Sequence, residues 1–223
     1  KTHGMKFLVT GGCSFSTVLN HDADIIHGGT WPHVLKLLGF TPDTQHIATA
    51  ESGIGNGLIS RRLIRTLIDL IKNQKISADN IVVGVMWSGP DRQEILLDTG
   101  WERITRDQLF LTRYNNYLTN LVYTCEHILR LQCFLKSHNI KYFMSTYMNE
   151  VLPEICKTHP ELKYLYESID HSLFLPIDGA YEWCRDHSGI TFPKRGDLHP
   201  GFKQWHAFTE QVILPFLKER NMI

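Results

Sequence analysis

Residues 5–16 read Met-Lys-Phe-Leu-Val-Thr-Gly-Gly-Cys-Ser-Phe-Ser, and this stretch decides the fold. Its mostly apolar first half, from Met5 to Val9, is typical of a parallel strand that is buried on both faces. Gly11 and Gly12 then end the strand, and Ser14 follows where the chain has to turn. Because ligands of open parallel sheets bind beyond the carboxyl ends of the strands, Ser14 is a candidate nucleophile.

The composition indicates one globular domain without a dominant charge. The chain has 223 residues, and Lys plus Arg equal Asp plus Glu at 23 each. A balanced charge gives no field that would attract a polyanion or a membrane surface, so we expect neither nucleic acid nor a membrane as a partner. No apolar run approaches the about 18 residues that a membrane span needs. We therefore expect a single soluble, cytoplasmic domain over residues 5–223.

The start of the chain and its cysteines agree with a reducing compartment. Residues 1–4 precede Met5 and read as a remnant added for expression, and no signal peptide follows them. The five cysteines are odd in number, far apart and without a CxxC pair. That pattern argues against a disulfide framework and against a zinc ribbon.

Strands alternate with helices along the rest of the chain. Further strands are predicted at 45–48, 81–86 and 141–145, with a short one at 189–192. Helices are predicted at 30–39, 57–71, 107–137, 161–168 and 180–187, and again from Phe202 onward. This alternation predicts a three-layer α/β/α, flavodoxin-like fold with a sheet of about five parallel strands. Segments 17–29, 92–106 and 146–172 are expected to be mainly loops that determine specificity.

Four polar or glycine-rich turns follow predicted strands or precede the last helix: Gly12-Cys13-Ser14, Ser52-Gly53, Trp87-Ser88 and Asp197-Leu198-His199. In a parallel sheet the strand ends meet at one edge, so we expect these turns to converge there. Ester hydrolysis requires a nucleophilic hydroxyl, an imidazole base, a group that orients the imidazole, and donors for the oxyanion. The four turns contain all of these groups.

In order and separation, the four turns resemble the conserved blocks of the SGNH (GDSL-type) hydrolases over nearly the whole chain. The resemblance implies that Ser14 is the nucleophile, His199 the base and Asp197 the residue that orients the base. It implies an oxyanion hole formed by the N–H groups of Ser14 and Gly53, with Gly55 as the alternative if the turn is offset. It also implies the SGNH fold and a carboxylic ester hydrolase that needs no cofactor.

The chain departs from that family pattern in three places. Cys13 stands where an aspartate is usual, and Asp197 lies two residues before His199 instead of three. The third block lacks its asparagine, an oxyanion donor, and Ser88 is the nearest replacement. Loss of one such donor typically lowers the rate about 100- to 1,000-fold. These departures leave a non-catalytic binding or structural module as an alternative to a hydrolase. Acyl transfer to an acceptor other than water, with the same residues, is a third possibility.

The substrate is expected to be a small acyl ester or an O-acyl group on a carbohydrate. Arg92, Trp87 and Asn56 lie in the same turns and are the candidate substrate-binding residues. Arg92 suits an anionic part of a substrate, although pairing with Asp91 or Glu94 is the alternative. The sequence leaves the oligomeric state open.

Other chemistries fit the sequence less well. A dinucleotide fingerprint at Gly53–Gly57 would need a glycine where Leu58 stands. A cysteine phosphatase would need an arginine at the position of Leu19. The loop residues His21, Asp22, Asp24 and His27 form the one cluster suited to a metal, but such loop residues are usually solvated, so no metal is expected.

Overall fold

The computed structural model describes residues 6–17, 29–104, 116–192 and 198–223. Four parallel strands form its main sheet in the order β2-β1-β3-β6. They are β1 (Phe7–Gly12), β2 (Gln45–Ala48), β3 (Ile81–Trp87) and β6 (Lys141–Thr146). Every residue of β1 and β3 is buried, as expected for strands covered by helices on both faces.

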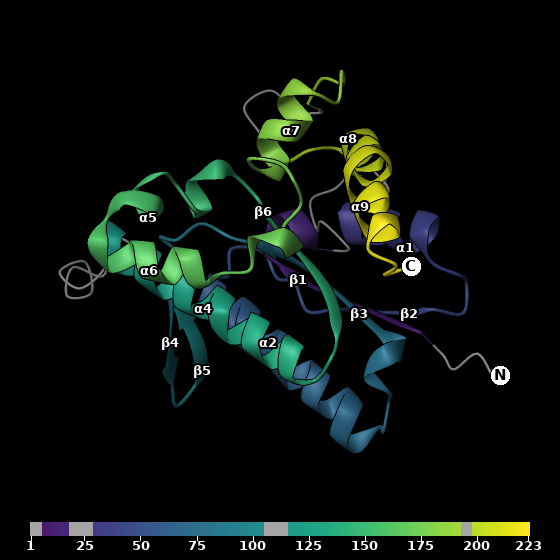
Figure 1. The fold of residues 1–223 in the computed structure, drawn as a ribbon, viewed down its shortest axis with the longest axis horizontal. Coiled ribbons are helices and arrows are strands. Elements are labelled where there is room, and N and C mark those ends of the chain that lie inside the picture. The colour runs from purple at the N-terminus through teal and green to yellow at the C-terminus, as the bar shows by residue number, and fades with distance from the viewer. Residues whose placement is uncertain (1–5, 18–28, 105–115, 193–197) are drawn as a thin grey trace.

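Helices cover both faces of this sheet (Figure 1). A Cβ atom at Gly11 would lie 2.6 Å from Leu63 of α2 (Asn56–Ile68), which packs on α4 (Tyr117–Ser137). A Cβ atom at Gly84 would lie 2.9 Å from Trp31 of α1 (Trp31–Gly39), which lies on the other face. The predicted three-layer α/β/α fold is therefore confirmed.

The last part of the chain packs beside α1. It consists of α8 (Phe202–Phe208), a π-helical turn η7 (Thr209–Ile213) and α9 (Leu214–Glu219). Pro215 lies in the first turn of α9, and a proline cannot donate to the helical ladder, so a change of hydrogen-bond register before it is expected. Within the described ranges, no helix is both long and apolar enough to cross a membrane.

The predicted strand at 189–192 is wrong, because these residues have no regular structure. The next position along the sheet is instead taken by Phe174, which forms a single parallel bridge with Met144 of β6. Leu175 N also donates to Met144 O at 2.9 Å. The main sheet of the described chain thus has four strands and one isolated bridge.

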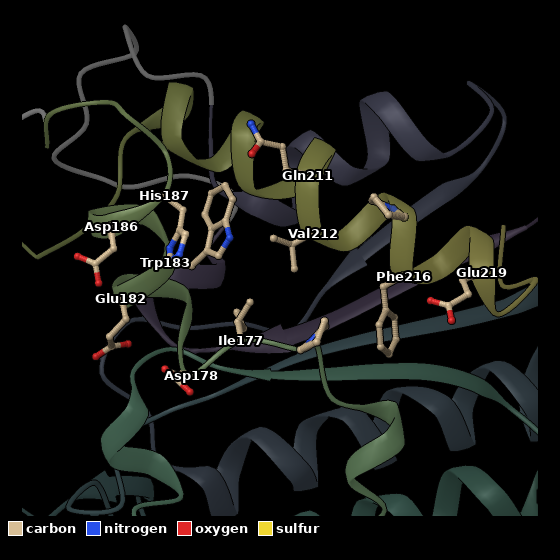
Figure 2. A pocket seen from close by; sticks show the side chains of 12 residues that line it. Ile177, Asp178, Glu182, Trp183, Asp186, His187, Gln211, Val212, Phe216 and Glu219 are labelled. Carbon is tan, nitrogen blue, oxygen red and sulfur yellow. The ribbon is translucent and has the colours of Figure 1, made fainter.

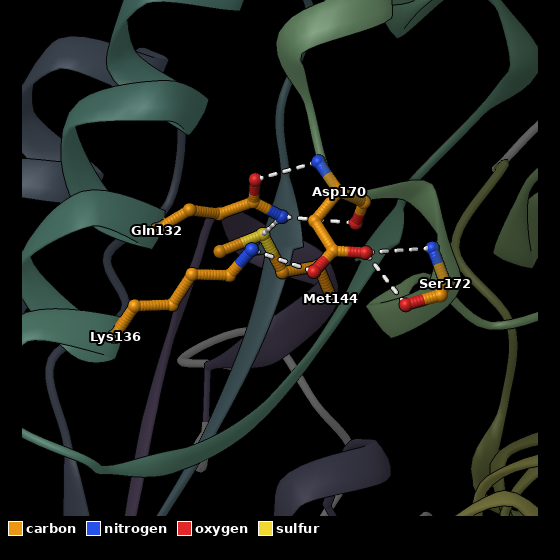
Figure 3. Close-up of polar contacts among 5 residues, drawn as sticks. All are labelled: Gln132, Lys136, Met144, Asp170 and Ser172. Carbon is orange, nitrogen blue, oxygen red and sulfur yellow. Dashed lines mark hydrogen bonds and ion pairs between the residues drawn. The ribbon is translucent and has the colours of Figure 1, made fainter.

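Asp170 fixes this edge segment to α4 (Figure 3). Its carboxylate accepts from Lys136 Nζ at 2.6 Å and from the Ser172 hydroxyl at 2.6 Å. The buried Gln132 side chain accepts from Asp170 N at 2.9 Å and donates to Asp170 O at 3.1 Å. Both backbone groups of Asp170 are therefore satisfied by one side chain, which holds the chain beside β6 after α6 (Pro160–Ser168).

Segment 92–106, expected to be a loop, contains an antiparallel hairpin. Its strands are β4 (Glu94–Leu97) and β5 (Gly100–Arg103), and Gly100 adopts a positive φ of 124° at the turn. The signal for this hairpin was the apolar run Ile95-Leu96-Leu97 followed by an Asp-Thr-Gly turn. The other predicted elements match closely, including α7 (Ala180–Asp186), whereas positions 107–115 of the predicted long helix lie outside the described residues.

Candidate active site

Ser14 begins a 3-10 turn, η1 (Ser14–Ser16), directly after β1. Gly12 makes this turn possible: its φ is 155°, and a Cβ atom there would lie 2.3 Å from Ser16 Oγ and 2.9 Å from Met86 O. Trp31 Nε1 donates to Ser16 Oγ at 2.9 Å and fixes the turn from the α1 side. Ser14 is consequently held at the carboxyl edge of the sheet, with 8% of its surface exposed.

His199 meets Ser14 at this edge. Its Nε2 atom lies 2.8 Å from Ser14 Oγ, within hydrogen-bonding distance. The imidazole packs against the ring of Phe15, with 4.9 Å between the centroids. Phe15 also contacts Trp205 of α8 and Tyr147, with centroids 5.9 Å and 5.2 Å away. The buried Phe15 ring therefore links Ser14's own turn to the elements around His199, a role that the sequence analysis missed.

Asp197 lies outside the described residues, so its contact with His199 stays a prediction. His21, Asp22, Asp24 and His27 also lie outside them. In the part of the chain that the structure describes, no group of three or more His, Cys, Asp or Glu side chains is arranged to hold a metal ion.

Three strand ends stand level at this edge. Gly12 of β1 is in register with Met86 of β3, and Glu51 N, beyond β2, donates to Gly12 O at 3.2 Å. Ser14 and Ser88 each follow two residues after the Gly12–Met86 pair, and Gly53 follows two residues after Glu51. Gly53 has a φ of 77°, and its N–H donates no hydrogen bond to any residue in the described ranges. The predicted convergence of the first three turns is thus visible in the backbone register.

The N–H of Gly55, the alternative oxyanion donor, is already engaged. It donates to the Glu94 carboxylate of β4. Burial raises the pKa of Glu94, while the Gly55 N–H and the Arg103 charge oppose that rise. Arg103 of β5 also donates to the Ser52 carbonyl. The hairpin therefore holds the Ser52–Gly55 turn in place and occupies the N–H of Gly55 but not that of Gly53.

Asn56 and Trp87, predicted to contact substrate, are buried inside the fold. The Asn56 side chain accepts from Ser88 N at 2.7 Å and donates to Ser88 O at 2.9 Å, and it also reaches the Thr124 hydroxyl at 3.1 Å. The Trp87 ring is completely buried, and its Nε1 atom faces Met144 Sδ at 3.4 Å. Both side chains stabilise the end of β3, and neither is accessible to a ligand in this structure.

Two solved structures resemble this chain over almost its full length. TesA matches with a TM-score of 0.51 and 15% identity, covering 96% of this chain and 99% of its own. The YxiM protein of Bacillus subtilis matches with a TM-score of 0.55 and 14% identity. The chain has the SGNH-hydrolase fold.

The match to YxiM covers 97% of this chain and 57% of the Bacillus protein, so this chain spans little more than half of that relative's length. No family model and no curated protein matches the sequence. At identities of 14–15%, the likeness to these two structures establishes the fold alone.

Ser88 occupies the place where the SGNH pattern has an asparagine, but its hydroxyl faces inward. Ser88 is completely buried, and its Oγ atom accepts from Arg92 Nη1 at 2.8 Å. The half-buried Arg92 guanidinium lies 5.5 Å from the centre of the Tyr147 ring. Among the described residues no carboxylate forms an ion pair with Arg92, so the predicted alternative of pairing with Asp91 or Glu94 is not observed.

A separate open cavity of about 530 Å³ lies between α7, η7 and α9 (Figure 2). Trp183, Val212 and Phe216 provide its apolar lining. Four carboxylates also line it, those of Asp178, Glu182, Asp186 and Glu219. Neither Ser14 nor His199 is among the lining residues, so this cavity is distinct from the strand-end site.

Proposed function

We propose that this protein is a serine hydrolase that cleaves a carboxylic ester through an acyl-enzyme on Ser14. The observation that carries the proposal is the 2.8 Å approach of His199 Nε2 to Ser14 Oγ at the carboxyl edge of an SGNH-type sheet. A hydroxyl in contact with an imidazole is the arrangement required to activate a serine at neutral pH. The proposed substrates are small acyl esters and O-acyl groups on carbohydrates.

In the first half of the reaction, Ser14 Oγ bonds to the acyl carbon while its proton passes to His199 Nε2. The carbonyl π electrons move onto oxygen, and the N–H groups of Ser14 and Gly53 donate to that oxyanion. The tetrahedral intermediate then collapses, the ester C–O bond breaks, and the alcohol leaves with the proton from His199. Asp197 is proposed to orient the imidazole and stabilise its charged form.

In the second half, a water molecule loses a proton to His199 and attacks the acyl carbon. A second oxyanion forms in the same hole, and its collapse returns the proton to Ser14 and releases the acid. The Phe15 ring keeps the imidazole beside Ser14 through both halves, because it packs against His199 at 4.9 Å.

The proposal is tested by labelling and turnover together. The wild type is incubated with a fluorophosphonate probe and, separately, with p-nitrophenyl esters of increasing acyl length and with O-acetylated sugars. We expect covalent labelling of Ser14 and hydrolysis of at least one ester, and loss of both in Ser14→Ala. Ser137→Ala, which changes an exposed serine at the end of α4, is the matched control and should behave as wild type. A folded wild type without labelling and without hydrolysis would favour a binding module instead.

A further inference from the structure

We infer that Arg92 is the third oxyanion donor of this site, in the place of the asparagine that the chain lacks. The inference rests on the proposed function, since an oxyanion forms only if Ser14 attacks an acyl carbon. It assigns to Arg92 a catalytic role in the transition state, in contrast to the recognition of an anionic substrate group.

The position of Arg92 follows from Ser88. Ser88 stands two residues beyond Met86, as Ser14 stands two residues beyond Gly12, and Met86 and Gly12 are in register. Asn56 fixes both backbone groups of Ser88, so this corner of the site is rigid. The Ser88 hydroxyl is completely buried and cannot meet a substrate, whereas the guanidinium bonded to it is half-buried and partly accessible.

The guanidinium charge of Arg92 is not paired with a carboxylate of the described residues. Its guanidinium makes one side-chain hydrogen bond to a described residue, from Nη1 to Ser88 Oγ, and no ion pair with any carboxylate of the described ranges. A guanidinium carries five N–H donors, so most of them remain for a ligand. Asp91, the adjacent residue, forms no ion pair with Arg92 among the described residues, and the Glu94 carboxylate accepts from Gly55 N–H. A half-buried cation without a counter-ion favours an anion at this place.

The Tyr147 ring connects Arg92 to the catalytic pair. Its centroid lies 5.5 Å from the Arg92 guanidinium and 5.2 Å from the Phe15 ring, which in turn packs on His199. The Tyr147 hydroxyl donates to Glu150, which fixes the ring on which the guanidinium rests. Arg92 is thus one aromatic ring away from the Phe15–His199 pair, on the side of the third strand end.

In the reaction Arg92 gives a hydrogen bond and keeps its proton. As the bond between Ser14 Oγ and the acyl carbon forms, the carbonyl oxygen takes up a full negative charge and accepts from the guanidinium. A hydrogen bond between charged partners is about twice as strong as a neutral one, so a single arginine compensates for the missing amide donor.

The test compares Arg92→Gln, Arg92→Lys and wild type on a neutral acyl ester. We expect Arg92→Gln to lower kcat by about 100- to 1,000-fold with little change in KM, and Arg92→Lys to recover part of the loss because it restores the charge without the planar fork. Arg65→Gln changes an exposed arginine of α2 and is the matched control, with wild-type kcat expected. Thermal unfolding verifies that all variants fold.

A second measurement uses binding in place of turnover. An alkyl boronic acid adds to a nucleophilic serine as a tetrahedral anion, and calorimetry measures its affinity. Arg92→Gln should weaken this affinity in proportion to its loss of kcat. An unchanged kcat on neutral esters, or a loss confined to the KM of carboxylate-bearing esters, would overturn the inference. A wild type that forms no adduct and hydrolyses no ester would instead refute the proposed function, and the role of Arg92 with it.

Discussion

His199 Nε2 and Ser14 Oγ lie 2.8 Å apart although 185 positions separate the two residues in the sequence. We expect His199→Gln to lower kcat about 100- to 10,000-fold, because glutamine keeps a polar side chain but cannot take the serine proton at neutral pH. Steady-state kinetics on the best p-nitrophenyl ester measures the loss. His159→Gln, at the exposed start of α6, is the control and should retain wild-type kcat. Wild-type turnover in His199→Gln would exclude this histidine as the base.

The ring of Phe15 positions the imidazole and is predicted to matter for rate beyond its share of stability. Phe15→Leu keeps an apolar side chain but removes the contact with His199, so we expect kcat to fall while KM changes little. The buried ring also packs on Trp205 and Tyr147, and its truncation should cost about 1–2 kcal/mol of unfolding free energy.

A matched variant separates the two effects of Phe15. Phe134→Leu removes a partly buried ring that packs on His138 at 4.3 Å in the α4 region. It should lower stability without lowering kcat. If both variants lose activity only in proportion to the folded fraction measured by urea unfolding, Phe15 has no positioning role.

Asn56 is predicted to be one of the most sensitive polar positions of the fold. Asn56→Ala leaves the buried Ser88 N–H and C=O without their side-chain partner, which should cost about 1–3 kcal/mol. Urea unfolding monitored by tryptophan fluorescence measures the change. Asn73→Ala, where an exposed amide donates to Asp69, should cost less than about 0.5 kcal/mol. Equal losses in the two variants would contradict the role assigned to Asn56.

Gly55→Ala tests the contact between the second and third strand-end turns. A Cβ atom at Gly55 would lie 2.0 Å from the carbonyl oxygen of Arg92, so the two backbones must separate. We expect reduced stability together with loss of esterase activity, because Arg92 and the Gly53 turn move apart. The readouts are the midpoint of thermal unfolding and kcat. A variant with wild-type values in both would show that the turns are not in firm contact.

Two half-buried histidines, His46 and His127, should make the protein less stable in mild acid. Burial lowers the pKa of His46 to about 4, helped by the charges of His33 and Lys36, and burial likewise lowers the pKa of His127 to about 4, helped by Arg130 and Arg61. Between pH 4 and about 6.5 the unfolded chain binds protons that the folded chain does not. The stability of the folded chain that depends on these two neutral histidines is therefore fully present above about pH 6.5, and it is lost as the pH falls toward 4.

Each of these histidines adds at most about 1.4 kcal/mol per pH unit to the slope of the unfolding free energy against pH. Solvent screening makes the actual slope smaller, because both side chains are partly exposed. Urea unfolding at several pH values between 4.5 and 7.5 measures the slope. The double variant His46→Gln, His127→Gln should have a flatter profile over this window. An equal slope in wild type and double variant would mean that other groups cause the acid sensitivity.

The main architecture was predictable because its signals are local. β1 and β3 are mostly apolar runs, and their burial on both faces follows from that pattern. The Ile-Thr-Phe run at 190–192 has similar β-forming residues but is not a strand. Its place beside β6 is taken by Phe174, whose segment is held by Gln132 and Lys136 of α4. Which of the two segments pairs with β6 is decided by contacts with α4, and the sequence of residues 190–192 carries no sign of those contacts.

The sequence predicted that Ser14 and His199 meet, as the structure shows, but it did not predict the residues that support them. Ser14 and His199 stand at chain boundaries that sequence patterns mark. Asn56 looked like a ligand contact because it is a polar residue in a glycine-rich turn, yet its partners Ser88 and Thr124 come from β3 and α4. Only the packing of α2 against these elements determines that its amide points inward.

The hydrogen bond from Ser88 N–H to the Asn56 side chain makes the amide exchange of Ser88 a measure of how often α2 separates from the end of β3. This amide is buried and its acceptor belongs to another element, so it exchanges with solvent only when α2 and the end of β3 separate. Its deuterium exchange rate therefore reports the free energy of that separation. Slow exchange at Ser88 together with fast exchange in the β4–β5 hairpin would show that α2 and the end of β3 stay in contact while the hairpin opens.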